Sequence, residues 1–254
     1  MTENVDRRIL GAFVCIDAVT GSSVVPAIPV IPDPLWTVTP NHSGIYVIFD
    51  GPGLDSLTDE FLPSGTWPNP VSFEVTLQDP NLRYLPRRAT VTAPLAIPTS
   101  PATPSGVFVP QQVPVYPSPA ISVGQNWAII RASVTLSGTN PPQGLPWAYL
   151  QVVQNSNNAV LATGVSDTNG EALLAVIGLT VQPNTSGSGP VTTSVTPATV
   201  TAYFDPTTLS ELAGWIPDPD DISLNLTNPA FKTTSQPVQL SSGEEFPLNF
   251  QITV

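Results

Sequence analysis

Charged residues are scarce in this chain. Only 10% of its 254 residues are Asp, Glu, Lys or Arg, against about 25% in an average soluble protein, whereas 41% are hydrophobic. Positive charge is the scarcest, because 7 Lys and Arg stand against 19 Asp and Glu and leave a net charge of −12. A chain of this sign repels a phosphate backbone, so we expect no nucleic-acid partner.

The chain also has a single cysteine and a single histidine. Cys15 cannot form an internal disulfide, and its apolar surroundings, GAFVCIDAV, predict a buried and unreactive thiol. His42 alone excludes a metal site built from several histidines, and we expect it to cap the turn PNHSG. Neither residue predicts a catalytic centre.

The carboxylates do not form a recognisable site in the sequence either. Asp218, Asp220 and Asp221 in DPDD lack the spacing and the closing Glu of a calcium loop, so we interpret this segment as a solvated turn. The sequence has no glycine-rich phosphate loop, cysteine cluster or nucleophile elbow. We therefore predict that the protein is not an enzyme and has no catalytic residues, cofactor or metal.

Long apolar segments are missing as well. No run reaches the length that a membrane span needs, and the first residues, MTENVDRRIL, lack the apolar segment of a secretory signal. We expect synthesis in the cytoplasm without a signal peptide and no membrane insertion, followed by incorporation into a particle that can leave the cell.

Alternation with a period of two residues is what the sequence does have. In SFEVTLQD, the apolar Phe73, Val75 and Leu77 alternate with polar residues, which is typical of a half-buried strand. The 31 Pro and 17 Gly separate many such short runs. This pattern predicts an all-β fold of two antiparallel sandwiches of the transthyretin or immunoglobulin type.

One short helix is predicted in DPTTLSELAGW. Asp205 suits the capping position, Pro206 suits the first helical position, and Gly214 suits a left-handed stop. The helix would be barely two turns long.

The strongest change in composition is the proline-rich stretch PLAIPTSPATPSGVFVPQQVPVYPSPAIS. Proline lacks the amide that a central strand needs, so we predict a domain over 1–95, a linker or arm over 96–122, and a second domain over 123–254. Apolar side chains in an arm must be covered, either by their own domains or by a neighbouring subunit, and we favour the neighbour. These side chains are Val107, Phe108, Val109, Val113, Val115 and Tyr116.

The segment GVSDTNGEALLAV joins a polar turn directly to an apolar run, and NHSGIYVIF has a similar order in the first half of the chain. The order resembles the carboxypeptidase-regulatory-like family of transthyretin-like β-sandwiches, although Ala172 stands where that family usually has an aromatic residue. The resemblance implies that Asp167 and Asn169 accept backbone hydrogen bonds in the turn. It also implies that Gly170 has a positive φ and that the apolar run enters the sheet.

Arg83, Arg87 and Arg88 gather in NLRYLPRRATV. Two interpretations remain open for this cluster. The arginines could pair with acidic residues nearby in the chain, or they could contact an acidic neighbouring subunit.

Two functions follow from these features. The first is a non-catalytic structural subunit of a large assembly, such as a phage-tail-like or contractile injection particle, whose partners are other subunits and copies of the chain itself. The alternative is a surface adhesin or carbohydrate-binding module, in which tryptophans would stack on sugars. The tryptophans are Trp36, Trp67, Trp127, Trp147 and Trp215.

Overall fold

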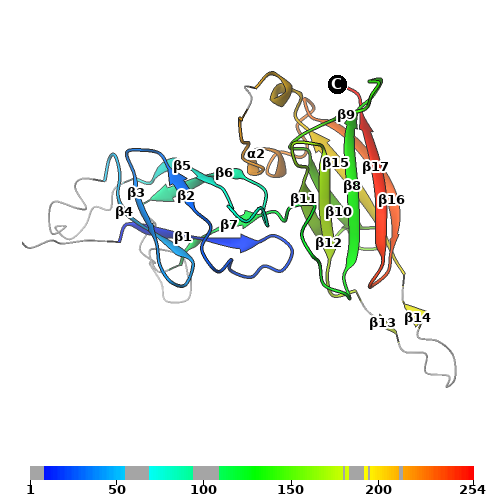
Figure 1. Cartoon of the computed structure of the whole chain (residues 1–254), viewed down its shortest axis with the longest axis horizontal. Helices are drawn as coiled ribbons and strands as arrows, with labels where there is room; N and C mark the ends of the chain where they lie inside the picture. The colour runs from blue at the N-terminus through cyan, green and yellow to red at the C-terminus, as the bar shows by residue number, and fades with distance from the viewer. Residues whose placement is uncertain are drawn as a thin grey trace, which may run out of the picture. The chain divides into compact units, whose positions relative to one another are not determined.

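The computed structural model describes residues 9–54, 69–93, 109–179, 181–182, 192–193, 195–211 and 214–254. The chain divides into two compact units, whose strands are labelled in Figure 1. The first unit comprises Met1–Asp17, Gly21–Pro80 and Pro86–Val115, and the second comprises Ala18–Thr20, Asn81–Leu85 and Tyr116–Val254.

The first unit consists of two β-sheets. One sheet has the strand order β3-β4-β1-β7 and the other has the order β2-β5-β6. The strands are β1 (Gly11–Asp17), β2 (Val30–Pro32), β3 (Thr37–Pro40), β4 (Ile45–Asp50), β5 (Val71–Leu77), β6 (Arg87–Ala93) and β7 (Gln111–Val115).

Alternating side chains of these strands form the interior of the first unit. In β5, Phe73, Val75 and Leu77 are buried, as the period of two predicts. Two aromatic pairs stack in the same unit: the ring of Phe13 lies 4.6 Å from that of Tyr46, and Trp36 stacks on Phe73 at 3.9 Å. Burial of these large side chains is the main stabilising contribution of the unit.

The second unit also consists of two principal sheets, with strand orders β11-β10-β15-β16 and β12-β8-β17. A short strand β9 pairs with β8, and β13 pairs with β14. The strands are β8 (Ala128–Leu136), β9 (Gln143–Gly144), β10 (Tyr149–Gln154), β11 (Val160–Val165), β12 (Glu171–Val176), β13 (Val181–Gln182), β14 (Thr192–Thr193), β15 (Thr196–Phe204), β16 (Lys232–Leu240) and β17 (Glu245–Ile252).

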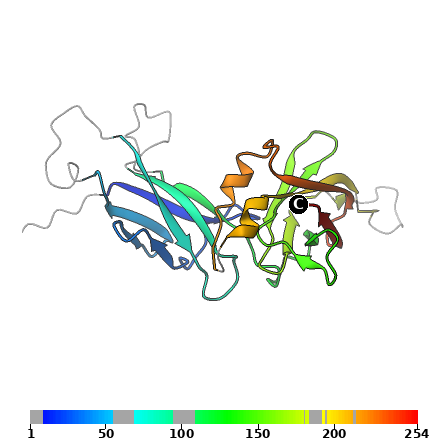
Figure 2. The ribbon, with the colours of Figure 1, turned by 90° about the horizontal axis from the view of Figure 1, so that it is seen from above.

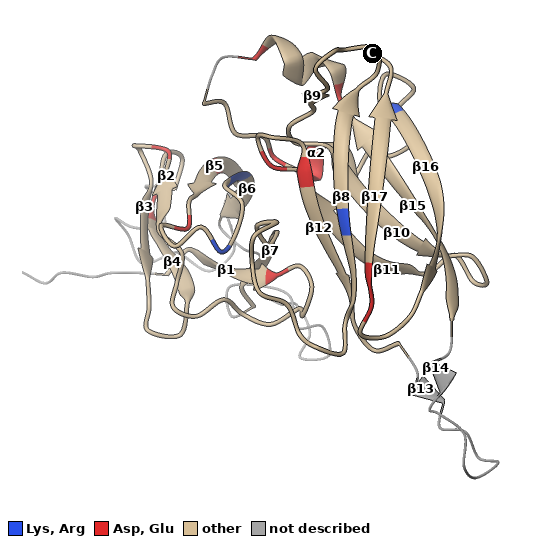
Figure 3. Ribbon diagram, turned by 45° about the vertical axis from the view of Figure 1, so that its right-hand side comes forward, with Lys and Arg blue, Asp and Glu red and all other residues tan. Residues whose placement is uncertain are grey.

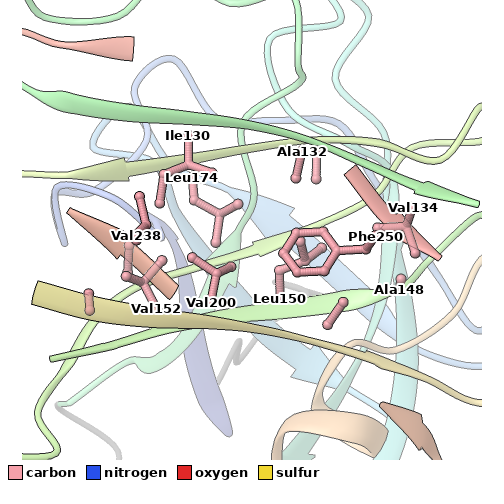
Figure 4. Close-up of a cluster of buried hydrophobic side chains, with 14 of the residues drawn as sticks. Ile130, Ala132, Val134, Ala148, Leu150, Val152, Leu174, Val200, Val238 and Phe250 are labelled. Carbon is pink, nitrogen blue, oxygen red and sulfur yellow. The ribbon is translucent and has the colours of Figure 1, made fainter. Parts of the chain in front are cut away.

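The core of the second unit lies between its two principal sheets. Ile130 and Val134 of β8 and Phe250 of β17 face Leu150 of β10 and Val200 of β15, as Figure 4 shows. All five side chains are fully buried. The predicted all-β sandwich fold is thereby confirmed for the described residues.

Each unit contains one parallel strand pair that the sequence did not predict. In the first unit, β1 lies between β4, which is antiparallel, and β7, which is parallel. In the second unit, β8 lies in the same way between the antiparallel β12 and the parallel β17. The first and last strands of each unit are therefore neighbours, so the two units share one topology at this point.

The predicted helix is a 3-10 helix, η1 (Pro206–Ser210), shown in gold in Figure 2. The Asp205 carboxylate accepts a hydrogen bond from the Thr207 amide at 2.9 Å, and Gly214 has a φ of +90°. Asp205 and Pro206 were therefore identified correctly. The prediction for Gly214 is wrong, because η1 ends at Ser210 with Glu211 as its C-cap, and the helix is shorter and tighter than expected.

The prediction of a solvated turn at DPDD is wrong for Asp218, which is only 9% exposed. Its carboxylate accepts a hydrogen bond from the Asp220 amide at 3.1 Å. The backbone then forms a four-residue α-helix, α2 (Asp220–Ser223), which the sequence did not predict. A short polar side chain that captures the amide two residues on is a common way to start such a turn.

The predicted linker over 96–122 is wrong in part. Gln111–Val115 is the strand β7 of the first unit, parallel to β1. The sheet accepts Pro114 because β7 stands at the end of the strand order, where an edge strand has one side without ladder hydrogen bonds.

Candidate interaction surface

The turn before β12 is held by one carboxylate. The Asp167 side chain accepts hydrogen bonds from the amides of Asn169 at 2.8 Å and Glu171 at 2.9 Å, and Gly170 has a φ of +82°. The roles of Asp167 and Gly170 are confirmed. Asn169 differs from the prediction, because its backbone amide donates to Asp167 instead of its side chain accepting.

A second turn with the same hydrogen bonds precedes β4 in the first unit. The Asn41 side-chain oxygen accepts from the amides of Ser43 and Ile45, both at 2.9 Å, and Gly44 has a φ of +78°. Asn41 makes the same two hydrogen bonds as Asp167, because the turn needs only one acceptor oxygen. The resemblance between NHSG and SDTNG in the sequence therefore reflects equivalent turns before equivalent strands.

His42 lies in the turn before β4, but Asn41 performs the capping that was expected of the histidine. His42 instead lines a hollow of about 410 Å³ in the first unit. The hollow is open to solvent and not an enclosed cavity. The hollow is lined by Val25, Pro26, Ala27, Pro40, Asn41 and His42.

Cys15 is buried within the first unit, as its apolar surroundings predicted. Burial raises the pKa of its thiol to about 11, although a hydrogen bond with Tyr46 and the charge of Arg87 act in the opposite direction. Burial also raises the pKa of Tyr46, and the Tyr46 hydroxyl donates to the carbonyl of Ile28. A thiol in this state is a poor nucleophile.

The prediction that the arm binds a partner is wrong for three of its residues. Val113, Val115 and Tyr116 are 2%, 0% and 5% exposed within their own chain. The two valines alternate with Pro114 along β7, and this alternation turns their side chains toward the interior of the sandwich. Val109 is 40% exposed, and Val107 and Phe108 lie outside the described residues.

The basic cluster is separated by the fold. Arg87 is 1% exposed and donates hydrogen bonds to the carbonyls of Pro114 at 2.6 Å and Arg88 at 2.9 Å. Arg88 pairs with Glu74 at 3.3 Å, and the Arg83 guanidinium lies 5.7 Å from the ring centre of Tyr84. The prediction that Arg87 binds a partner is therefore wrong, because Arg87 holds β6 and β7 together. Arg88 pairs with an acidic residue of its own chain, which is the first of the two interpretations given for this cluster.

The described tryptophans serve packing. Trp36 and Trp147 are 7% and 9% exposed, and Trp127 and Trp215 pack against buried clusters of the second unit. Sugar stacking is therefore wrong for Trp36 and Trp147. Trp67 lies outside the described residues.

Three exposed apolar residues within one short segment of the first unit were missed by sequence reasoning. Val25, Ile31 and Leu35 are 59%, 60% and 71% exposed and lie in the short segment VVPAIPVIPDPL. The sequence signal that could have identified their exposure is the density of proline in this segment, because proline in a sheet is confined mainly to edge strands. We call Val25, Ile31 and Leu35, which are grouped by their nearness in the sequence, the apolar strip.

Within the residues that the structure describes, no three His, Cys, Asp or Glu side chains gather where they could hold a metal ion. Over the same residues, no helix is long and apolar enough to cross a membrane. Val25 belongs to the apolar strip and also lines the hollow, and we carry these two features forward.

No family model matches the sequence, and no curated protein matches it. Among solved structures, the chain is similar to the Bacillus anthracis TIE protein at 10% identity and a TM-score of 0.30, over 96% of this chain and 34% of that one. It is also similar to a streptococcal ancillary pilin at 10% identity and a TM-score of 0.27, and the match covers 86% of this chain and 50% of the pilin.

A 9R-lipoxygenase from Cyanothece is similar at 15% identity and a TM-score of 0.23, over 53% of this chain and 18% of that one. The chain thus spans half or less of the length of each of these three structures. At these values the comparisons assign the chain to no family.

Proposed function

We propose that this protein is a non-catalytic interaction subunit of a larger protein assembly. The observation that carries the proposal is the apolar strip. Val25, Ile31 and Leu35 keep more than half of their accessible surface in water, and each Å² of apolar surface kept in water costs about 25 cal/mol. A partner that covers the strip would recover this free energy.

The hollow beside the strip supports the same proposal. Val25 belongs to the strip and also lines the hollow with Pro26 and Pro40. A partner side chain that entered the hollow would meet apolar walls, with Asn41 and His42 as hydrogen-bonding groups. Such a combination of an apolar surface and a few polar groups is typical of a recognition site.

We further propose that the assembly is a phage-tail-like or contractile injection particle and that both units are transthyretin-like sandwiches. The support is the all-β chain with its low charge, its many prolines and its single buried cysteine. The partners would be other subunits and copies of this chain. Trp36 and Trp147 lie in the core, so the alternative function, a surface adhesin or carbohydrate-binding module, would have to use other residues for its sugar contacts.

The test is to express the tagged full-length chain in its native host and to separate the extract by density-gradient sedimentation and electron microscopy. We expect the wild-type chain in a high-mass particle. The triple variant Val25→Ser, Ile31→Ser, Leu35→Ser should sediment as the free chain, because the partner would lose its apolar contact surface.

Leu224→Ser serves as the matched control, because Leu224 is an exposed apolar residue of the second unit, at 81%. This variant should remain in the particle. Circular dichroism should show the same fold for all variants. A wild-type chain that sediments only as the free protein would refute the proposed function.

A further inference from the structure

The strand β6 stands at the end of the sheet β2-β5-β6, so one of its edges has no neighbouring strand within that sheet. Such an edge presents backbone N–H and C=O groups to which a strand of another molecule can bind, and proteins commonly protect it with prolines or charges. After Arg88, β6 continues as ATVTA and contains neither. The strand β7 is also uncharged and appears tan in Figure 3.

The register of the sheet shows which backbone groups of β6 point outward. The carbonyl of Glu74 in β5 accepts a hydrogen bond from the Asp33 amide at 3.2 Å, so the backbone of Glu74 faces away from β6. Thr90 pairs with Glu74, and Thr92 pairs with Ser72 two residues along. In an antiparallel ladder, residues that do not bond their partner turn their N–H and C=O groups to the other side. Thr90 and Thr92 therefore present these groups at the outer edge of β6.

The side chain of Gln111, the first residue of β7, occupies two of these groups. Its amide nitrogen donates to the Thr90 carbonyl at 2.9 Å, and its amide oxygen accepts from the Thr92 N–H at 3.2 Å. A residue of a parallel strand bonds the same pair of groups, the C=O of one residue and the N–H of the residue two positions later. The Gln111 side chain thus takes the place of a residue in an added strand.

The Arg87 guanidinium covers the same edge nearer the start of β6. It donates to the carbonyl of Arg88 in β6 at 2.9 Å and to the carbonyl of Pro114 in β7 at 2.6 Å. Arg88 precedes Thr90 by two residues, so its carbonyl lies on the same outward side. Because β6 and β7 end different sheets, the side chains of Arg87 and Gln111 close the corner between them.

The second unit has a comparable corner with an additional protection. The strands β16 and β17 also end different sheets, and the Gln236 side chain of β16 donates to the Asn249 carbonyl of β17 at 2.6 Å. Each of these strands also contains a proline, Pro237 or Pro247, which has no N–H to offer an added strand. Loss of the glutamine should therefore matter at β6 and not at this corner.

We propose that Gln111 guards the edge of β6 and prevents it from pairing with β6 of a second copy of the chain. Without the Gln111 amide, the Thr90 carbonyl and the Thr92 N–H need other hydrogen-bond partners. The same edge of a second copy, related by a two-fold axis, offers complementary groups in an antiparallel pair. This inference goes beyond the proposed function, because it identifies a surface that the fold withholds from self-association.

The experiment is sedimentation velocity of the purified full-length chain over a concentration series. Gln111→Met keeps the length and the apolar stem of the side chain but loses both hydrogen bonds. Its association constant should exceed that of the wild type roughly tenfold or more, because the edge can then accept a strand. Gln111→Asn, whose shorter side chain draws the amide back from β6, should associate in the same way. Circular dichroism should show the same sheet content in all variants.

Gln236→Met is the matched control, because it removes the same kind of side chain from an edge that prolines also protect. Its association constant should stay within about twofold of the wild type. Thr92→Pro, added to Gln111→Met, should return the association to the wild-type level. Proline removes the N–H that the added strand would bond, and this N–H points away from β5, so the pairing of β5 with β6 remains.

Three results would overturn the inference. Gln111→Met and Gln111→Asn could both associate no more strongly than the wild type, Gln236→Met could associate as strongly as Gln111→Met, or Thr92→Pro could leave the association of Gln111→Met unchanged. The first result would mean that the edge is closed without Gln111. The other two would mean that the added association does not pass through β6.

Discussion

At the scale of single residues, the buried thiol of Cys15 makes the stability of the fold depend on pH. Burial raises its pKa from 9.0 to about 11. Between these values the unfolded chain has lost the thiol proton while the folded chain retains it. The free energy of unfolding that Cys15 contributes is therefore fully present below about pH 9 and is lost as the pH rises toward 11.

We predict that Cys15→Val removes this dependence on pH. The difference in unfolding free energy between wild type and variant, measured by urea titration, should change by about 2–3 kcal/mol between pH 8 and pH 11. Burial, together with the neighbouring Cys15, also raises the pKa of Tyr46, so the difference between the two proteins reports this coupled pair and not the thiol alone. A difference that stays constant with pH would mean that the folded chain does not protect the thiol.

At the scale of elements, the turn before β12 depends on Gly170 for two separate reasons. Its φ is +82°, and a Cβ atom there would lie 2.4 Å from the Val134 carbonyl oxygen. Gly138 has nearly the same φ, +81°, but a Cβ atom there would meet nothing within 4 Å. The two glycines therefore separate backbone strain from steric overlap.

We predict that Gly138→Ala lowers the free energy of unfolding by about 1 kcal/mol, which is the cost of the left-handed backbone alone. Gly170→Ala should lower it by about 3 kcal/mol or more, because the β8 backbone must also move. Urea denaturation of both variants measures the difference. Equal losses would show that the turn has room for a side chain.

The turn and the strands could be predicted because their signals are local. Asp167 and Gly170 are adjacent to the amides and the backbone geometry that they serve, and alternation in β5 marks its own buried face. The strand β7 was missed because its prolines read as a linker. Whether a strand tolerates Pro114 depends on its being at a sheet edge, and that depends on β1, which is nearly a hundred residues away in the sequence.

The partner surfaces could not be predicted for the same reason. Arg87 looks like a surface charge in the sequence, but β6 and β7 enclose it. Conversely, Ile31 looks like a core residue, but it lies on a short edge strand of a three-stranded sheet and remains exposed. Burial is decided by long-range pairing, which residue type alone does not encode.

At the scale of the whole molecule, the residues after β7 belong to the second unit. Tyr116 packs with Trp147 and Tyr149, and its ring lies 6.5 Å from that of Tyr149, edge to face. Ile121 packs against Ile129 and Leu173 on the outer side of the sheet β12-β8-β17. The long continuous part of the second unit therefore begins at Tyr116 and not at residue 123.

This packing predicts that the end of the proline-rich segment stabilises the second unit. The double variant Tyr116→Ala, Ile121→Ala in the full-length chain should lower the free energy of unfolding of that unit by about 3–5 kcal/mol, since it removes apolar side chains that cover Tyr149 and Leu173. The measurement is urea denaturation followed by tryptophan fluorescence, since three of the five tryptophans, Trp127, Trp147 and Trp215, belong to the second unit. Val109→Ala, a substitution in the same segment at a position that is 40% exposed, should cost less than about 1 kcal/mol. If the double variant were no less stable than this control, residues 116–122 would be a tether between the units, as their proline content alone suggests.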